Sequence, residues 1–256
     1  MEFYILASGS KGNSSVFVNK NQEILLVDCG ISINDIKKKF LELNLDFNQI
    51  KAVLITHLHT DHCKYMRAFN KNLIYAHKDT FLDLDKSHLL DDYQEINILG
   101  FNLTILPMSH DIEGTLGFIM NYNQERLAFI TDTGYLHVNI QRLINNCDTY
   151  LIESNYDPRM LMLSNRPNFL KQRILSMRGH LSNQDCALIL ANVMGPKTKE
   201  IVFIHRSLET NSENLLLNTF FTIMKQKNID CSHLIINIAD QFISLVGGSL
   251  HPSLSR

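Results

Sequence analysis

The sequence predicts an α/β fold, a four-layer sandwich in which two sheets pack together with helices outside. Two observations predict it. Short β-like runs dominate the first half of the chain, and helical segments alternate with strands in the second half. No linker, repeat or low-complexity tract separates the two halves. We therefore expect one domain over residues 1–256.

The first half opens with a meander of three β-like runs, "EFYILA", "SSVFV" and "EILLVDCG", separated by turn-forming clusters. Ser32 and Asp35 then form a helix-start signature ahead of "NDIKKKFLEL". The run "KAVLIT" predicts a buried strand. Further strands are expected at the runs "NLIYA", "EINIL", "FNLTILPM", "TLGFIMNY" and "RLAFITD".

In the second half, helices separate the strands. We expect helices over residues 138–145, through "NFLKQRILSM", after Ser182, which has Asp185 three positions on, and after Asn211. Strands are predicted at "TYLIES" and "EIVFI" between these helices. The runs "LIINI" and "FISLV" are expected to form two short strands that close the chain.

Composition excludes several classes of protein. The N-terminal "MEFYILASGSKGN" is typical of a first strand and not of a secretory signal, and no window approaches the roughly 18 apolar residues that span a bilayer. The five cysteines contain no CxxC pair, which argues against a disulfide framework. We expect a soluble cytoplasmic protein without a membrane partner. Because the formal charge is −2, any nucleic-acid binding must depend on local charge.

The stretch "ITHLHTDHCK" places His57, His59, Asp61 and His62 at the end of an apolar run, and it holds three of the eleven histidines. On an extended strand end, His57 and His59 point to the same side and can bind one ion. Asp61 and His62 lie beyond the turn and point to a second position. Two neighbouring metal ions are therefore expected, each of which still lacks ligands.

Candidates for the missing ligands follow later β-like runs. His110 comes after "LTILPMS", Asp132 after "RLAFIT" and His205 after "EIVFI", and loops at strand ends are where functional sites collect. Any one of them alone is explained more simply as a hydrogen-bonded core or loop residue. The repetition of the same context favours the interpretation as ligands.

The box "THLHTDH" resembles the HxHxDH signature of the metallo-β-lactamase superfamily, and Asp28 in "LLVDCG" precedes it in the same order as in that family. The resemblance implies an αβ/βα sandwich. It also implies two metal sites that share Asp132, the first with the ligands His57, His59 and His110, and the second with the ligands Asp61, His62 and His205.

Further motifs resemble the WalJ (YycJ) group, bacterial proteins related to the ribonuclease Z and exonuclease branches. These motifs are "ASGSKGNSS", "SHDIEGTLGF", "TDTGY", "ESNYD" and "GHLSN". Where the group leads us to expect "ESNHD", this sequence has Tyr156. We therefore do not assign to Tyr156 the role that a histidine would have at this position in the group.

His180 in "RGHLSN" and His205 in "FIHRS" compete for the last ligand position. His205 ends a strand-like run, as the other proposed ligands do, whereas His180 lies between two predicted helices. The nuclease branch that the chain resembles also has a separate Gly-His-Ser-like motif ahead of the terminal ligand. We therefore assign His205 to the metal, and His180 to chemistry or substrate.

Two adjacent divalent ions suit phosphodiester hydrolysis, because they lower the pKa of water and stabilise both oxygens of an in-line displacement. Asp61 is also expected to orient the attacking water. His180 is a candidate to protonate the leaving oxygen, with Glu153 holding its other nitrogen. The alternative is a structural histidine beside a strand-end carboxylate. Zinc suits the histidine-rich ligands best, and manganese and iron bind similar sites.

Residues 158–180 contain basic residues and no acidic residue. Because Lys171, Arg173 and Arg178 flank His180 in sequence, we expect them to contact phosphates. In the turn "SGSKGN", Lys11 and Asn13 are weaker candidates for the same role. A solvated helix face and a tight hairpin are the respective alternatives.

The function predicted first is a metal-dependent nuclease, an exonuclease with a nucleic-acid substrate, and its preference for DNA over RNA comes from the resemblance alone. One alternative is a hydrolase of a small thioester, lactam or cyclic phosphodiester. Another is a regulatory protein whose metals are structural. The basic segment favours a polyanionic substrate, and the open coordination implied by so few protein ligands argues against a structural role.

Overall fold

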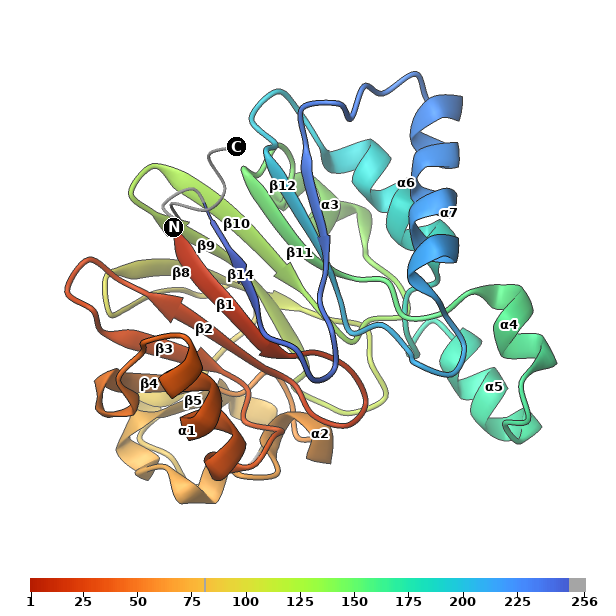
Figure 1. The fold of residues 1–256 in the computed structure, drawn as a ribbon. Coiled ribbons are helices and arrows are strands. Elements are labelled where there is room, and N and C mark those ends of the chain that lie inside the picture. Colours follow the sequence, from red (N-terminus) through yellow and green to blue (C-terminus); the bar gives the residue numbers. More distant parts are fainter. Residues whose placement is uncertain (81, 249–256) are drawn as a thin grey trace. The chain divides into compact units, whose positions relative to one another are not determined.

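The computed structural model describes residues 1–80 and 82–248 (Figure 1). These residues form two compact units. Unit 1 contains residues 1–107, residues 112–125 and the described residues from 239 on, and unit 2 contains residues 108–111 and 126–238. The prediction of a single domain stays a prediction.

Within the described residues, unit 1 is built on a seven-stranded mixed sheet in the order β14-β1-β2-β3-β4-β5-β6. The pairs among β14, β1, β2 and β3 are antiparallel, as the predicted meander requires, and the pairs from β3 to β6 are parallel. The carboxyl ends of parallel strands are where sites collect in such sheets. The bounds are β1 Glu2–Ala7, β2 Ser14–Val18, β3 Ile24–Val27, β4 Ile50–Leu54, β5 Ile74–His77, β6 Leu89–Leu90 and β14 Leu245–Gly247.

Helix α1 (Ile33–Glu42) packs on one face of this sheet (Figure 1). The Ser32 hydroxyl accepts a hydrogen bond from the Asp35 amide at 3.1 Å, so the helix begins where the sequence predicts. Ile36 and Phe40 lie four residues apart on the buried side of the helix, in one cluster with strand residues such as Leu26. Burying each of these side chains stabilises the unit by roughly 1.5–3 kcal/mol.

Unit 1 also contains the antiparallel strands β7 (Glu95–Ile98), β8 (Phe101–Pro107) and β9 (Leu116–Tyr122), which belong to a second sheet. Leu99 and Gly100 connect β7 to β8, both with positive φ (54° and 86°). A two-residue hairpin with positive φ at both positions matches the twist of the strands that it joins. The loop between β8 and β9 carries residues 108–111, which include His110 and belong to unit 2.

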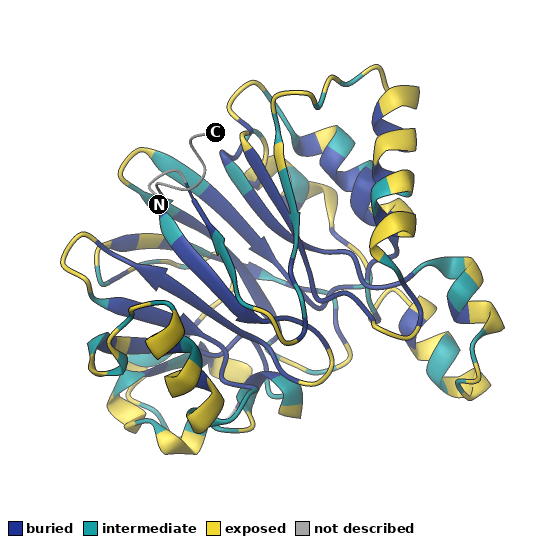
Figure 2. Cartoon of the chain, in the orientation of Figure 1, coloured by how far each residue is buried: buried dark blue, intermediate teal, exposed yellow. Residues whose placement is uncertain are grey.

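Unit 2 is built on parallel strands that pair in the order β10, β11, β12, β13 and belong to the second sheet. Helix α6 lies against α7, and Figure 2 shows α7 buried along one side and exposed along the other. The Phe203 ring on β12 meets the Phe220 ring on α7 edge to face, with 5.5 Å between centroids. The bounds are β10 Glu125–Ile130, β11 Thr149–Glu153, β12 Glu200–Ile204, β13 Ile235–Ile238, α3 Val138–Leu143, α4 Pro158–Leu163, α5 Asn168–Leu175, α6 Asn183–Val193 and α7 Glu213–Gln226.

The structure differs from the sequence prediction in the short strand β6, in α4 and in the last strand. Helix α4 was not predicted, although the sequence has a helix-start signal at Asp157 and Pro158. The Asp157 side chain accepts a hydrogen bond from the Met160 amide at 2.8 Å, and Pro158 occupies the first helical turn. The last predicted strand, "FISLV", is shorter and shifted, since β14 spans only Leu245–Gly247. No helix in the described part of the chain is long and apolar enough to cross a membrane. The cytoplasmic location stays a prediction.

Candidate functional site

The histidine box of unit 1 lies directly after β4. The strand ends at Leu54, and the Ile55 amide still donates to the Tyr75 carbonyl at 2.9 Å, so the backbone remains extended toward His57. His59 then caps a single helical turn, α2 (Thr60–Cys63), which carries Asp61 and His62. The sequence predicted a turn at this point, and the structure specifies it as helical.

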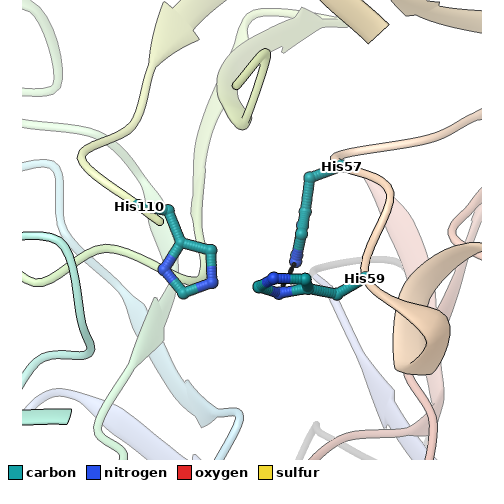
Figure 3. A group of neighbouring side chains, drawn as sticks. All are labelled: His57, His59 and His110. Carbon is teal, nitrogen blue, oxygen red and sulfur yellow. Dashed lines mark hydrogen bonds between the residues drawn. The ribbon is translucent and has the colours of Figure 1, made fainter. Parts of the chain in front are cut away.

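The imidazoles of His57 and His59, which the spacing of two predicts to point to the same side, lie close together. His57 Nε2 lies 3.1 Å from His59 Nδ1, and the two rings are nearly perpendicular (Figure 3). The hydroxyl of Thr56 contacts His57 Nδ1 at 3.1 Å. That contact holds the orientation of the His57 ring, which is fully buried.

Asp28 directly follows β3 and orients the box from the neighbouring strand. Its Oδ2 lies 2.6 Å from His62 Nδ1, and its Oδ1 accepts the Thr56 amide at 2.8 Å. A carboxylate on one imidazole nitrogen fixes the tautomer and makes the other nitrogen a better metal ligand. The motif series includes Asp28 but does not indicate this role. Thr56 was not predicted as a site residue, although a hydroxyl residue directly before the box is a signal for it.

Asn13, which was predicted to bind substrate, is buried beside the box. Its Oδ1 accepts the Gly9 amide at 2.7 Å, and its Nδ2 lies 2.9 Å from His62 Nε2. These contacts support the tight-turn explanation, and substrate binding by Asn13 stays a prediction. Cys63 follows His62, and burial raises the pKa of its thiol. A raised pKa favours the protonated thiol over the thiolate that binds metals.

Four site residues of unit 2 meet at one edge of its parallel strands. Asp132 follows β10 by two residues, Glu153 is the last residue of β11, and His205 directly follows β12, while His180 lies just before α6. Because β10, β11 and β12 are parallel and in register, their carboxyl ends lie side by side. Potential ligand atoms of these four residues all lie within 4.8 Å of one another.

Glu153 is fully buried and serves both histidines. Its Oε1 lies 2.7 Å from His180 Nδ1 and 2.8 Å from His205 Nδ1, and its Oε2 accepts the amides of Thr133 and Leu181. Burial alone would raise the pKa of Glu153, but the charge of His180 and the hydrogen bonds from both imidazoles outweigh it and lower that pKa. The expected contact with His180 is present, whereas the contact with His205 was not foreseen.

His110 is held in place by the segment ahead of His180. Its Nδ1 lies 2.9 Å from the Gly179 carbonyl, and its Nε2 lies 3.9 Å from Asp132 Oδ1. Burial lowers the pKa of His110 and so favours the neutral imidazole that coordinates metals.

The three basic residues predicted to bind substrate have protein partners. Arg178 Nε donates to the His110 carbonyl at 2.7 Å, Arg173 pairs with Asp111, and Lys171 Nζ donates to the Met162 carbonyl at 2.7 Å. The two arginines therefore fasten the loop that carries His110, which a count of charges along the sequence cannot show.

Three site residues have backbone conformations that side chains rarely adopt. Asp28, Asp132 and His205 have φ values of 62°, 49° and 52°, and each stands just after a parallel strand. Left-handed backbone at residues other than glycine costs free energy and clusters at functional sites. In each case the backbone turns sharply after the strand. The side chain therefore does not follow the alternation of side chains between the two faces of the sheet.

Comparison with known proteins identifies the family. The family model described as "Beta-lactamase superfamily domain" matches residues 24–206, which is well over half of the chain. The chain belongs to the metallo-β-lactamase superfamily. It is 30% identical over 241 residues to the Bacillus anthracis protein named exodeoxyribonuclease YycJ, covering 89% of this chain and 90% of that one. Exodeoxyribonuclease WalJ of Streptococcus pneumoniae serotype 2 is likewise 30% identical over 242 residues.

Solved structures of the superfamily share the fold. The metallo-beta-lactamase fold protein YhfI from Bacillus subtilis matches 96% of this chain and 100% of its own, with a TM-score of 0.69 and 17% identity. The short form of human tRNase Z matches 96% and 98%, with a TM-score of 0.63 and 15% identity. The predictions of an α/β sandwich fold and of the WalJ-like group are therefore confirmed. As a superfamily member with such relatives, the chain is a metal-dependent hydrolase.

The donor chemistry of both groups fits the divalent metal ions on which such hydrolases depend. Unit 1 offers imidazole nitrogens and the Asp61 carboxylate, and unit 2 offers imidazole nitrogens beside the carboxylates of Asp132 and Glu153. First-row divalent ions accept this mixture of nitrogen and oxygen donors. The fixed orientation of His62 by Asp28, and of His205 by Glu153, is the kind of support that metal-binding histidines have.

Tyr156, where the superfamily group led us to expect histidine, is buried. It packs with Leu161 and Ile174 in a small apolar cluster at the base of α4 and α5. Burial raises the pKa of its phenol to about 12, so it stays neutral. Tyr156 therefore anchors the α4–α5 segment.

Proposed function

We propose that this protein is a dinuclear metal-dependent nuclease, an exonuclease that acts on DNA. The observation that carries the proposal is the 30% identity, along 89% of the chain, to proteins named exodeoxyribonucleases. The basic residues ahead of His180 support a polyanionic substrate. The preference for DNA over RNA rests on the names of these relatives.

The proposed ligands follow the order of the superfamily motifs. His57, His59 and His110 would hold one metal, Asp61, His62 and His205 would hold the other, and Asp132 would serve both. The assignment rests on motif order and on the donor chemistry of each group. Two bound divalent ions would lower the pKa of a water molecule and stabilise the oxygens of the displaced phosphodiester. Zinc is the ion proposed first, with manganese and iron as the alternatives.

His180 is proposed as the general acid. Its Nδ1 faces Glu153 Oε1 at 2.7 Å, which leaves Nε2 as the nitrogen that delivers a proton to the leaving oxygen. The side chain of His180 is 17% exposed, whereas that of His205 is 3% exposed. A proton donor must reach the substrate, so this difference supports chemistry for His180 and metal binding for His205. Asp61, 22% exposed, is proposed to orient the attacking water.

Phosphate contacts are proposed for Lys171, Arg173 and Arg178. Arg178 Nε and Arg173 Nε both contact the His110 loop, and a guanidinium carries five N–H donors, more than one such contact requires. The arginines can therefore hold the loop and contact phosphate at once. Lys11 and Asn13 are weaker candidates, and the contacts of Asn13 with Gly9 and His62 leave it the least support.

The test is digestion of labelled single- and double-stranded DNA and RNA, each with a 5′-phosphate or a 5′-hydroxyl, in zinc and in manganese. We expect stepwise shortening of DNA from one end. Asp132→Ala should abolish it and lower the metal content. The nuclease proposal fails if fully metallated protein degrades none of these substrates, or if wild type and Asp132→Ala behave alike. Hydrolysis confined to small thioesters or cyclic phosphodiesters would point to the alternative hydrolase.

His180→Ala tests the proton transfer. We expect kcat to fall about 10²- to 10⁴-fold with full metal content, because a general acid contributes that much. His233→Ala, at an exposed histidine of the same unit, is the matched control and should retain wild-type turnover. Near-normal turnover of a fully metallated His180→Ala would remove the assignment.

A further inference from the structure

Unit 1 contains a second candidate site beside the histidine box. A cavity of about 650 Å³ lies between one side of α1, the residues after α2 and the segment over residues 241–244. Cavities of roughly 300–1,000 Å³ are the size that binds small ligands or parts of larger ones. The residues that give this cavity its chemical character are Lys11, Lys38, Lys39, Lys64, Tyr65 and Phe242.

The cavity is basic and aromatic at once. The ammonium group of Lys11 lies 5.3 Å from the centre of the Phe242 ring, and that of Lys64 lies 5.4 Å from the centre of the Tyr65 ring. The lining also holds two carboxylates: Glu42 faces Lys38 at 4.0 Å, and Asp35 accepts the Ser32 hydroxyl. Four lysines against these two carboxylates leave the lining with a net positive charge.

Hydrogen bonds hold the turn that carries Phe242 in a fixed position. The Ser8 amide donates to the Asp240 carbonyl at 3.0 Å, and the Lys39 ammonium donates to the Phe242 carbonyl. Gln241, which is 3% exposed, accepts the Lys11 amide and donates to the Gly12 carbonyl, both at 3.0 Å. The Phe242 ring is nevertheless 59% exposed. An ordered backbone that presents a large apolar ring to solvent is what a stacking platform requires.

The cavity adjoins residues proposed to bind metal. Lys64 and Tyr65 follow α2, which carries Asp61 and His62. The Tyr65 amide donates to the Cys29 carbonyl at 3.1 Å, and the Cys29 amide donates to the His62 carbonyl at 2.7 Å. A ligand bound along Tyr65 would therefore lie one helical turn from the box.

We propose that this cavity binds a single-stranded segment of the nucleic-acid substrate, with bases stacked on Phe242 and Tyr65 and phosphates beside Lys11 and Lys64. Aromatic platforms next to lysines are the features by which proteins hold single strands without reading their sequence. The inference rests on the proposed nuclease function, because that function supplies the polyanionic strand. It adds a binding site that none of the metal or proton-transfer residues provides.

The test measures binding of fluorescent oligothymidylate with phosphorothioate linkages to the metal-loaded full chain, by anisotropy at several salt concentrations. We expect Phe242→Ala to weaken binding about 5- to 100-fold, as loss of one stacked base does. It should leave the salt dependence unchanged. Lys64→Gln should instead reduce the slope of log K against log salt by about 0.7, the value for one phosphate contact with a single strand.

Phe221→Ala, at a half-exposed ring on α7, and Lys20→Gln, at an exposed lysine of the β2–β3 hairpin, are the matched controls. Both should bind as wild type does. The inference is overturned if Phe242→Ala and Lys64→Gln also bind as wild type, or if thymidine 5′-monophosphate competes as strongly as the oligomer. Cleavage is assayed in parallel on unmodified DNA. If the protein cleaves DNA but neither Phe242→Ala nor Lys64→Gln changes binding, the cavity proposal alone is refuted. If the wild-type protein cleaves no DNA, the nuclease proposal is refuted.

Discussion

The two units orient their histidines in different ways. In unit 1, His57, His59 and His62 come from six consecutive residues, and the Asp28 carboxylate reaches one of them, His62. In unit 2, His180 and His205 are 25 positions apart in the numbering, and the Glu153 carboxylate receives both at 2.7 and 2.8 Å. Unit 1 therefore positions its histidines by local chain geometry, and unit 2 by one shared buried acceptor.

This difference determines how many site residues a single substitution affects. Removing Asp28 affects His62 and takes the acceptor from the Thr56 amide and hydroxyl, but His57 and His59 keep their mutual contact. Removing Glu153 affects the proposed acid His180 and the proposed ligand His205 together, and it also leaves the amides of Thr133 and Leu181 without their acceptor. Buried polar groups that lose their partners cost about 1–3 kcal/mol each. The shared acceptor is the more vulnerable arrangement.

The largest expected effect is that of Glu153→Gln. We expect kcat/KM for oligonucleotide hydrolysis to fall about 10³-fold or more, since the loss combines misplaced proton transfer with weakened metal binding. The measurement is steady-state kinetics together with metal content. Glu209→Gln, on an exposed glutamate that pairs with Arg166, is the control and should stay near wild type. If Glu153→Gln loses no more activity than Asp28→Asn, sharing one acceptor has no special consequence.

Asp28→Asn is expected to have a smaller effect. An asparagine oxygen can still accept the Thr56 amide, but the charge beside His62 is lost, and metal affinity should fall about 10- to 100-fold. Metal is titrated into metal-free protein, and the recovery of activity measures the change in metal affinity. Saturating metal should then restore most of the turnover of Asp28→Asn, whereas Glu153→Gln should stay impaired. Failure of excess metal to rescue Asp28→Asn would contradict a purely orienting role.

Parts of both groups could be predicted because they are local in the sequence. The box is contiguous, and Asp132 and His205 each follow an apolar run, so strand ends identify them without a structure. Parallel pairing of β10, β11 and β12 then brings their carboxyl ends together, which is a property of the fold class.

The rest depends on register and packing, which the sequence does not display. Glu153 meets His205 only because β11 pairs in register with β12, where Glu153 lies opposite Ile204. Arg178 reaches the His110 carbonyl across 68 positions of sequence. A basic run ahead of His180 predicted phosphate binding, yet the same residues also fasten a loop, and charge alone does not separate these roles.

Each unit also has a glycine that keeps its group in place. A Cβ on Gly30 would meet the Asp61 carbonyl oxygen at 1.7 Å, and a Cβ on Gly179 would meet the Ile174 carbonyl oxygen at 2.2 Å. Backbone atoms cannot move aside cheaply, so Gly30→Ala and Gly179→Ala should each lower the free energy of unfolding by about 2 kcal/mol. Urea denaturation measures this loss.

Gly100→Ala is the control for these two substitutions. Its Cβ would have 3.9 Å of space, so only its φ of 86° opposes the change, at a cost of about 1 kcal/mol. Equal losses at Gly30, Gly179 and Gly100 would show that the close approaches do not hold the two groups in place.

The smallest expected effect is that of Tyr156→His, which restores the residue expected for the superfamily group. Tyr156 packs with Leu161 and Ile174 in a small apolar cluster and is not one of the four residues of the Glu153 group. Exchanging its ring for a smaller polar one should therefore lower the free energy of unfolding by about 1 kcal/mol without raising kcat. Tyr156→Phe, which keeps an apolar ring of nearly the same size, should cost less. Thermal unfolding and steady-state kinetics on both variants measure the contrast. A gain in turnover or in metal affinity for Tyr156→His would place this position in the active site and would extend the shared-acceptor arrangement of unit 2 by one residue.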